Sequence, residues 1–158
     1  MDKIQSIKMS DISKKKISHR SASAICEVEV TKEILLKIIN NELPKGDVIA
    51  TAKIAGILAV KKTDELIPLC HSIPISNANI DIIVPAEDSN NFIILIKSFV
   101  ESDAQTGVEM EALAAVTVAG LTIYDMTKSY SHAINLRNIR LLEKKGGKSG
   151  DFTTDLSD

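Results

Sequence analysis

The sequence predicts an α+β fold in which helices cover one face of a four-stranded antiparallel sheet. Segments with alternating apolar and polar residues predict strands, and segments whose apolar residues recur every three or four positions predict helices. These segments follow one another in the order β-α-α-β-β-α-β. Two helices on one face of such a sheet form the ferredoxin-like arrangement, here with one extra helix. The segments span, in order, residues 24–30, 32–40, 48–62, 75–84, 92–101, 108–130 and 133–144.

The first strand and the first helix are each marked by a local pattern. In residues 24–30, Cys26 and Val28 fall on the face opposite Glu27, as expected for a half-buried strand. Thr31 follows directly and can cap the helix over residues 32–40.

The later elements follow from the same rules. Asp47 can cap a helix over residues 48–62, and a polar turn makes a hairpin of the strands at 75–84 and 92–101. The long apolar helix at 108–130 then packs on the sheet, because a mostly apolar helix must be buried.

Length and composition indicate one domain with an aliphatic core. The chain has 158 residues, no Trp, two Tyr and three Phe. We expect an N-terminal arm at residues 1–20, a single catalytic domain at 21–152 and a tail at 153–158. The arm is polar and basic. It is either a solvated segment or an arm that folds over a partner subunit or substrate.

Charge and cysteine content exclude several classes of protein. The net charge of −2 provides no overall field for nucleic acid, so any anion site must be built locally. Two cysteines make neither a disulfide framework nor a structural zinc site, so we expect a reduced, cytoplasmic protein without a dedicated metal centre. A membrane partner is not expected, because the longest apolar stretch is interrupted by charges and a span needs roughly 20 apolar residues.

The long helix at 108–130 carries four charged residues: Glu109, Glu111, Asp125 and Lys128. Because unpaired buried charges are costly, we expect a core helix that keeps them to form a functional site. Asp125 and Lys128 share a helix face and form either a surface ion pair or a desolvated acid/base pair. Glu109 and Glu111 can simply stabilise the first turn.

The spacing within this helix limits what one subunit can do. Glu111 and Asp125 are 14 residues apart, which is roughly 21 Å along a helix axis. One small substrate cannot readily touch both within one chain. Either the site is assembled from two subunits or one of the two residues is structural.

Two further segments are candidates for chemistry. His71 follows Cys70 and is either a packed histidine, a metal ligand or a group for proton transfer near neutral pH. The glycine-rich stretch at 146–151 includes Lys148 and forms either a solvated tail or a phosphate-binding flap. It is not a P-loop, because Leu142 stands where that motif requires glycine.

Several ordered motifs make the chain resemble the cyclic pyranopterin monophosphate synthase family, often called MoaC. The strong match runs from about residue 45 to residue 152, and a weaker match includes residues 11–13 and Arg20. The motifs are KGDV at 45–48, IAGI at 54–57, LIPLCH at 66–71, VEMEAL at 108–113, LTIYDM at 121–126 and GGKSGD at 146–151.

The resemblance implies a ferredoxin-like fold and a homohexamer built as a trimer of dimers, with active sites at the dimer interface. The implied reaction converts 3′,8-cyclo-7,8-dihydroguanosine 5′-triphosphate to cyclic pyranopterin monophosphate and pyrophosphate in molybdenum cofactor biosynthesis. No protein-bound cofactor is implied, and magnesium carried by the triphosphate is compatible with this chemistry.

The resemblance also implies which residues act. The expected catalytic residues are Asp125, Lys128, His71, Lys45 and Lys144. The expected substrate contacts are Leu69, Cys70, His71, Met110 and Glu111, and Lys148 is added from the glycine-rich stretch.

Three positions depart from the family pattern. Ser72 stands where proline is common, Thr127 where cysteine is often found, and Lys53 where arginine is common. The alternative to an enzyme is a non-catalytic ferredoxin-like module that binds a nucleotide and regulates a partner. Such a module does not explain Asp125 and Lys128 within an apolar helix.

Overall fold

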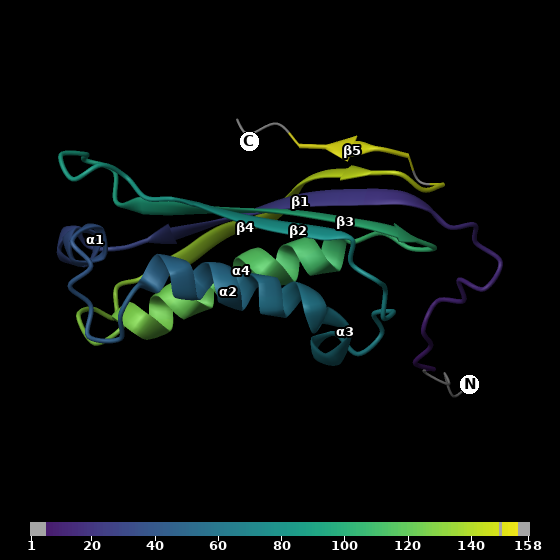
Figure 1. Ribbon diagram of the computed structural model, residues 1–158, viewed down its shortest axis with the longest axis horizontal. Coiled ribbons are helices and arrows are strands. Elements are labelled where there is room, and N and C mark those ends of the chain that lie inside the picture. The colour runs from purple at the N-terminus through teal and green to yellow at the C-terminus, as the bar shows by residue number, and fades with distance from the viewer. Residues whose placement is uncertain (1–5, 149, 155–158) are drawn as a thin grey trace, which may run out of the picture.

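The protein is a layer of helices packed against one twisted sheet (Figure 1). The structure, a computed structural model, describes residues 6–148 and 150–154. The expected start of the arm, Ser149 and the end of the tail at 155–158 lie outside these residues. The elements are β1 (Ser18–Glu29), α1 (Lys32–Ile39), α2 (Val48–Lys61), α3 (Thr63–Leu66), β2 (Asn77–Ile83), β3 (Ile93–Ala104), α4 (Glu109–Thr127), β4 (Asn135–Lys145) and β5 (Phe152–Thr153).

The sheet has the strand order β2-β3-β1-β4-β5, and every neighbouring pair is antiparallel. The four predicted strands are therefore present, but the prediction of a four-stranded sheet is incomplete. After the turn at Gly146 and Gly147, both with positive φ, the chain folds back and β5 pairs with the end of β4. Two residues are too few to show a period, so the sequence pattern did not reveal this strand.

Strand β1 is central and longer than predicted. It begins at Ser18 rather than at residue 24, and it pairs with β3 from Ser18↔Ala104 to Glu29↔Ile93. The added residues are mostly small or polar and carry no apolar alternation. Ser21 and Ala22 are nevertheless buried, because strands pair with β1 on both sides at these positions.

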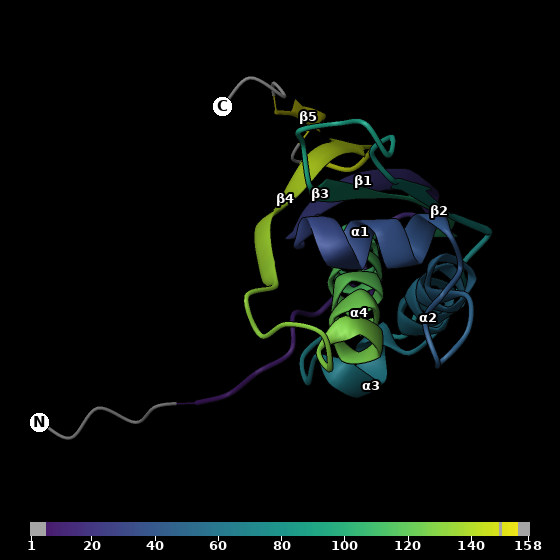
Figure 2. The same ribbon diagram turned by 90° about the vertical axis from the view of Figure 1, so that its left-hand side faces the viewer.

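The helices cover one face of the sheet, as Figure 2 shows end-on. Alternation along β3 places Ile94, Ile96 and Val100 on the covered face, each fully buried. The core is aliphatic, as the composition predicts. Its largest fully buried side chains include Ile34, Leu35, Ile94, Ile96, Ile123, Val28, Val100, Val108 and Val116.

Helices α2 and α4 approach closely because glycine lies at their contact. A Cβ atom on Gly56 of α2 would stand 3.2 Å from the Ala115 carbonyl oxygen of α4 and 3.2 Å from the Ile80 side chain. On the sheet side of α4, a Cβ atom on Gly120 would stand 3.0 Å from Leu136 and 3.2 Å from Cys26 Sγ. Both helices therefore sit close to their neighbours, which fixes the direction of α4.

Both predicted N-caps are confirmed. The Thr31 hydroxyl accepts from the Ile34 amide at 3.3 Å, and an Asp47 carboxylate oxygen accepts from the Ala50 amide at 2.9 Å. The single turn α3 was not predicted as a helix. Within the described residues, no helix is long and apolar enough to cross a lipid bilayer.

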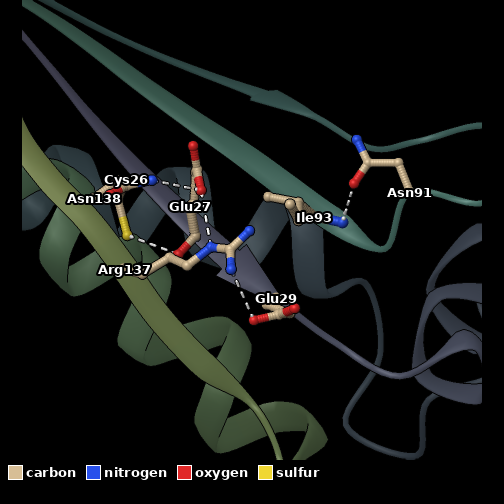
Figure 3. A network of polar contacts seen from close by, with 7 residues as sticks. All are labelled: Cys26, Glu27, Glu29, Asn91, Ile93, Arg137 and Asn138. Carbon is tan, nitrogen blue, oxygen red and sulfur yellow. Dashed lines mark hydrogen bonds and ion pairs between the residues drawn. The ribbon is translucent and has the colours of Figure 1, made fainter. Parts of the chain in front are cut away.

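On the uncovered face of the sheet, Arg137 joins β4 to β1 (Figure 3). Its Nε donates to Glu27 at 3.0 Å and its Nη1 to Glu29 at 3.1 Å, while Asn138 donates to the same Glu27 carboxylate at 2.9 Å. These bonds lie where the β1–β4 register shifts. They hold β4 across the irregularity, and the same strand carries Lys144 further along.

Candidate active site

Helix α4 separates the predicted functional residues into two groups. The helix is continuous from Glu109 to Thr127, with Glu111 in its first turn and Asp125 in its last. Their separation of 14 residues corresponds to roughly 21 Å along the axis. The first turn lies at the end of the molecule where the N-terminal arm runs, and the last turn lies toward α1 (Figure 1).

The first group, here called the Asp125 cluster, consists of Lys45, Asp125 and Lys128. Lys128 Nζ lies 2.8 Å from Asp125 Oδ1, and Lys45 Nζ lies 2.7 Å from Oδ2. Lys45 also donates to the Asp125 carbonyl oxygen at 2.9 Å. Lys45 stands in the turn before α2, where Gly46 adopts a φ of +91° that few other residues tolerate. The KGD turn thus brings a cation from α2 to the end of α4.

The two lysines hold the aspartate in its ionised form. Hydrogen bonds and charge from Lys128, and next from Lys45, lower the pKa of Asp125 to about 2. In turn, the Asp125 carboxylate raises the pKa of Lys128. At neutral pH the cluster is therefore a carboxylate between two ammonium groups, with a net positive charge available to an anion.

The sequence left open whether Asp125 and Lys128 form a surface ion pair or a desolvated acid/base pair, and in the single chain they form a surface ion pair. The side chains of Asp125 and Lys128 are 56% and 51% exposed, so Lys128 is not desolvated. Ile123 and Met126 point into the core, but the 100° step between helix residues turns the two charged positions toward solvent. Glu111 is the fully buried exception, at 3% exposure.

The second group surrounds a cavity of about 240 Å³ at the start of α4, here called the Glu111 pocket. Burial raises the pKa of Glu111, and its Oε2 has no hydrogen-bond partner within the described residues. The same environment raises the pKa of Cys70, through burial first and the Glu111 charge next. The pocket is lined by Ser10, Ile12, Lys15, Leu69, Cys70, His71, Thr106, Gly107, Glu109, Met110 and Glu111.

This pocket unites two segments that are distant in the sequence. Leu69, Cys70 and His71 come from the loop after α3, and Met110 and Glu111 come from the first turn of α4. All five were predicted as substrate contacts. An unpartnered, buried carboxyl group facing a cavity is suited to bind the N–H or O–H groups of a ligand.

A larger cavity of about 730 Å³, here called the basic cavity, adjoins the Glu111 pocket. The two share Lys15, Thr106, Gly107 and Glu109 as lining residues. The basic cavity is also lined by Lys14, Lys16, Ser18, Arg20, Gln105, Gly147 and Lys148. Five cationic side chains around one cavity provide a local anion site that the net charge of the chain does not reveal.

Lys14–Lys16 and Arg20 were not among the predicted site residues, although one interpretation of the arm had it fold over a partner subunit or substrate. Gln105 donates to the Lys15 carbonyl oxygen at 2.8 Å, which ties the arm to the loop before α4. Arg20 lies against Gly147, where a Cβ atom would collide with its guanidinium group. The run of three lysines was the available signal, but a charge run by itself usually indicates a solvated segment.

The structure thus brings Lys45, Asp125 and Lys128 together at one end of α4. At the other end it brings the five substrate-contact residues together, with Lys148 on the adjoining cavity. Lys144 lies at this end as well, 3.4 Å from Glu109. The two groups do not meet within one chain. In the part of the chain that the structure describes, no three His, Cys, Asp or Glu side chains are grouped to hold a metal ion.

A helix–sheet layer with cation-lined cavities and a buried carboxyl group defines an α+β protein built to hold a small anionic ligand. The chain belongs to the MoaC family, whose sequence profile matches residues 9–147. The family predicted from the sequence motifs is therefore confirmed.

Proteins named cyclic pyranopterin monophosphate synthase are similar to this chain over nearly its whole length. The protein from Trichodesmium erythraeum (strain IMS101) is 45% identical over 152 residues, which cover 96% of this chain and 90% of that protein. The protein from Desulfatibacillum aliphaticivorans is 43% identical over 155 residues, covering 98% and 96%. The protein from Bacillus thuringiensis (strain Al Hakam) is 45% identical over 146 residues, covering 92% and 90%.

Proposed function

We propose that this chain is a lyase that converts 3′,8-cyclo-7,8-dihydroguanosine 5′-triphosphate to cyclic pyranopterin monophosphate and pyrophosphate in molybdenum cofactor biosynthesis. The observation that carries the proposal is the 45% identity to a synthase over 96% of the chain. The residues that the reaction needs are present at both ends of α4.

The reaction opens the purine-derived ring, rebuilds a pyranopterin and closes a cyclic phosphate as pyrophosphate leaves. These steps need proton transfers and neutralisation of a polyphosphate. Asp125, Lys128 and His71 are the groups for proton transfer. Lys45 and Lys144 stabilise charge. Lys45 Nζ lies 2.7 Å from the Asp125 carboxylate.

The basic cavity is the place for the triphosphate. Its Lys14, Lys16, Arg20 and Lys148 side chains surround a space of about 730 Å³, next to the smaller Glu111 pocket that would take the heterocycle. Magnesium would enter as part of the substrate, bound to the phosphates.

A complete site requires two subunits of a ferredoxin-like fold. The roughly 21 Å between Glu111 and Asp125 supports a site that takes the Glu111 pocket from one chain and the Asp125 cluster from its partner. The homohexamer, built as a trimer of dimers, supplies such interfaces. The core elements β1, α2, β2, β3, α4 and β4 follow the β-α-β-β-α-β order of that fold, with α1 as an addition. We expect the enzyme to be cytoplasmic.

Turnover tests the proposal directly. Purified protein is incubated with the cyclised dihydro-GTP substrate, and pyrophosphate and pterin product are measured together. Lys128→Ala should lower turnover by roughly 100-fold or more, the usual scale for a lost proton-transfer group. Lys62→Ala is a matched control, because Lys62 also forms an exposed i,i+3 ion pair, at 3.3 Å from Glu65.

The outcomes separate the candidate functions. Both products from the wild type, with loss in Lys128→Ala and not in Lys62→Ala, support the lyase. Tight binding without either product would instead indicate a regulatory nucleotide-binding module. If the protein neither binds nor converts the substrate, the result would indicate a purely structural oligomer.

A further inference from the structure

Gly107 lies where the backbone faces a carboxylate at very short range. A Cβ atom built on Gly107 would collide with Glu109 Oε2, and its next neighbours would be Cδ and Oε1 of the same side chain. Gly107 is not among the glycines with positive φ, so its backbone conformation does not require glycine. The three atoms nearest to that Cβ position all belong to the Glu109 side chain.

Glu109 uses this space to reach another strand. Its Oε1 lies 3.4 Å from Lys144 Nζ, and the two side chains are only 31% and 22% exposed. Lys144 belongs to β4 and pairs with Ala22 of β1 and Phe152 of β5, so its backbone is held on both sides. The ion pair therefore joins the first turn of α4 to a fixed point of the sheet.

The pair also has a defined place in the site. Glu109 lines both the Glu111 pocket and the basic cavity, so it stands where the two meet. The Lys144 ammonium group, held against Glu109, therefore lies between the pocket proposed for the heterocycle and the cavity proposed for the phosphates. Because Lys144 has a long, flexible side chain, an ion pair with Glu109 restricts the position of its ammonium group.

We propose that Glu109 is a positioning residue that holds Lys144 at the junction of the two cavities, and that residue 107 must be glycine to admit its carboxylate. This rests on the proposed function, in which Lys144 stabilises charge during turnover. Glu109 itself touches no reacting atom in this scheme.

Three variants test the coupling: Gly107→Ala, Glu109→Ala and the double variant. Each single change should lower kcat by roughly 10- to 100-fold, with little change in KM, because a misplaced charged group costs rate more than binding. The double variant should be no slower than Glu109→Ala, since the added methyl group no longer displaces a carboxylate. Unchanged melting temperatures would exclude a folding defect as the cause.

Glu143→Ala is the matched control. Glu143 lies on the same strand as Lys144 and pairs with Lys145 at 2.8 Å, so the change removes a carboxylate from a closer ion pair that lines neither cavity. It should leave kcat and KM unchanged.

A second readout does not depend on turnover. Acylation of lysines, followed by peptide mass spectrometry, should show Lys144 reacting severalfold faster in Gly107→Ala and Glu109→Ala, with Lys145 unchanged. If the wild type forms no product but Lys144 still reacts faster in the variants than in the wild type, the proposed function is refuted and the positioning role is not. Wild-type kcat and labelling in Gly107→Ala, or losses that multiply in the double variant, would overturn the positioning role.

Discussion

At the scale of single residues, the carboxyl groups at the two ends of α4 have pKa values that are shifted in opposite directions. Asp125 is exposed and faces two lysines, so its pKa falls to about 2. Burial raises the pKa of Glu111, and its Oε2 has no hydrogen-bond partner among the described residues. The ionised form is therefore favoured at Asp125, whereas the protonated form is favoured at Glu111 relative to a free glutamate.

The titration of Asp125 should report both of its partners. We expect ¹³C NMR of the carboxyl carbon to give a midpoint near about 2, against the 3.8 of a free aspartate. Lys128→Ala should move this midpoint toward 3.8 further than Lys45→Ala does, because Lys128 is the larger cause. Since the folded pKa is depressed, the pair stabilises the fold above pH 3.8 and that contribution disappears as pH falls through about 2.

An equal effect of the two lysine variants would contradict the order of causes. A midpoint of 3.8 in the wild type would mean that the cluster is not formed in solution.

Glu111→Gln should make the protein more stable at high pH and lower its turnover. The folded pKa of Glu111 lies above its reference value of 4.5, so the folded state loses stability as pH rises from 4.5 through that folded pKa. At pH 8 the variant should be more stable by about 1 kcal/mol, because it no longer buries an unpaired charge. Its advantage should vanish below pH 4.5, and turnover should fall because the substrate contact is altered.

Thermal unfolding of both proteins at pH 4 and pH 8 provides the measurement. A variant that is less stable at pH 8 would show that the carboxylate has a stabilising partner in the assembled protein.

At the scale of elements, the position of α4 depends on the glycines at its contacts. Gly56 allows α2 to lie against the backbone of α4, and Gly120 allows α4 to lie against Leu136 and Cys26. This packing directs the first turn of α4 toward the arm and its last turn toward the KGD turn. The direction of one helix thus places both groups of candidate site residues.

Gly56→Ala should destabilise the protein even though alanine favours a helix. The added methyl group would stand 3.2 Å from the Ala115 carbonyl oxygen, which is helix backbone and cannot rotate away. Helix propensity offers a gain of about 1 kcal/mol, and overpacking costs about 1–3 kcal/mol. We expect a net loss of about 1 kcal/mol, measured by urea unfolding.

Ala50→Gly in the same helix is the control, because Ala50 is exposed and reports propensity without packing. A stabilised Gly56→Ala would show that α2 and α4 separate at little cost.

At the scale of the whole molecule, the two groups of candidate site residues lie at opposite ends of α4 and do not meet within one chain. In a two-fold symmetric dimer, each complete site would take one half from each subunit. Variants defective in different halves should therefore complement each other, whereas variants in the same half should not.

Mixing His71→Ala with Lys128→Ala tests this arrangement. In each mixed dimer one site carries both changes and the other carries none, so an equal mixture should recover about one quarter of wild-type turnover after subunit exchange. His71→Ala mixed with Glu111→Gln should recover nothing, because both changes lie in the same half. No recovery in the first mixture would mean that each chain builds its own site.

The local parts of this protein follow from its sequence. Hydrophobic periodicity indicated α1, α2, α4 and four strands, and the caps at Thr31 and Asp47 marked helix starts within a residue. The motifs indicated the family, because their order and spacing are rarely met by chance. The 14-residue spacing within one helix also indicated the separation of Glu111 from Asp125.

Only the tertiary structure decided which charges are buried, what surrounds the cavities and where the arm lies. The burial of Ser21, the exposure of Lys128 and the contact of Arg20 with Gly147 depend on elements far apart in the chain. The same holds for Gly107, where a Cβ atom would collide with the Glu109 carboxylate that faces Lys144 of another strand. Periodicity and capping are interactions between near neighbours along the chain, whereas a site is made of distances across it, and those are set by packing.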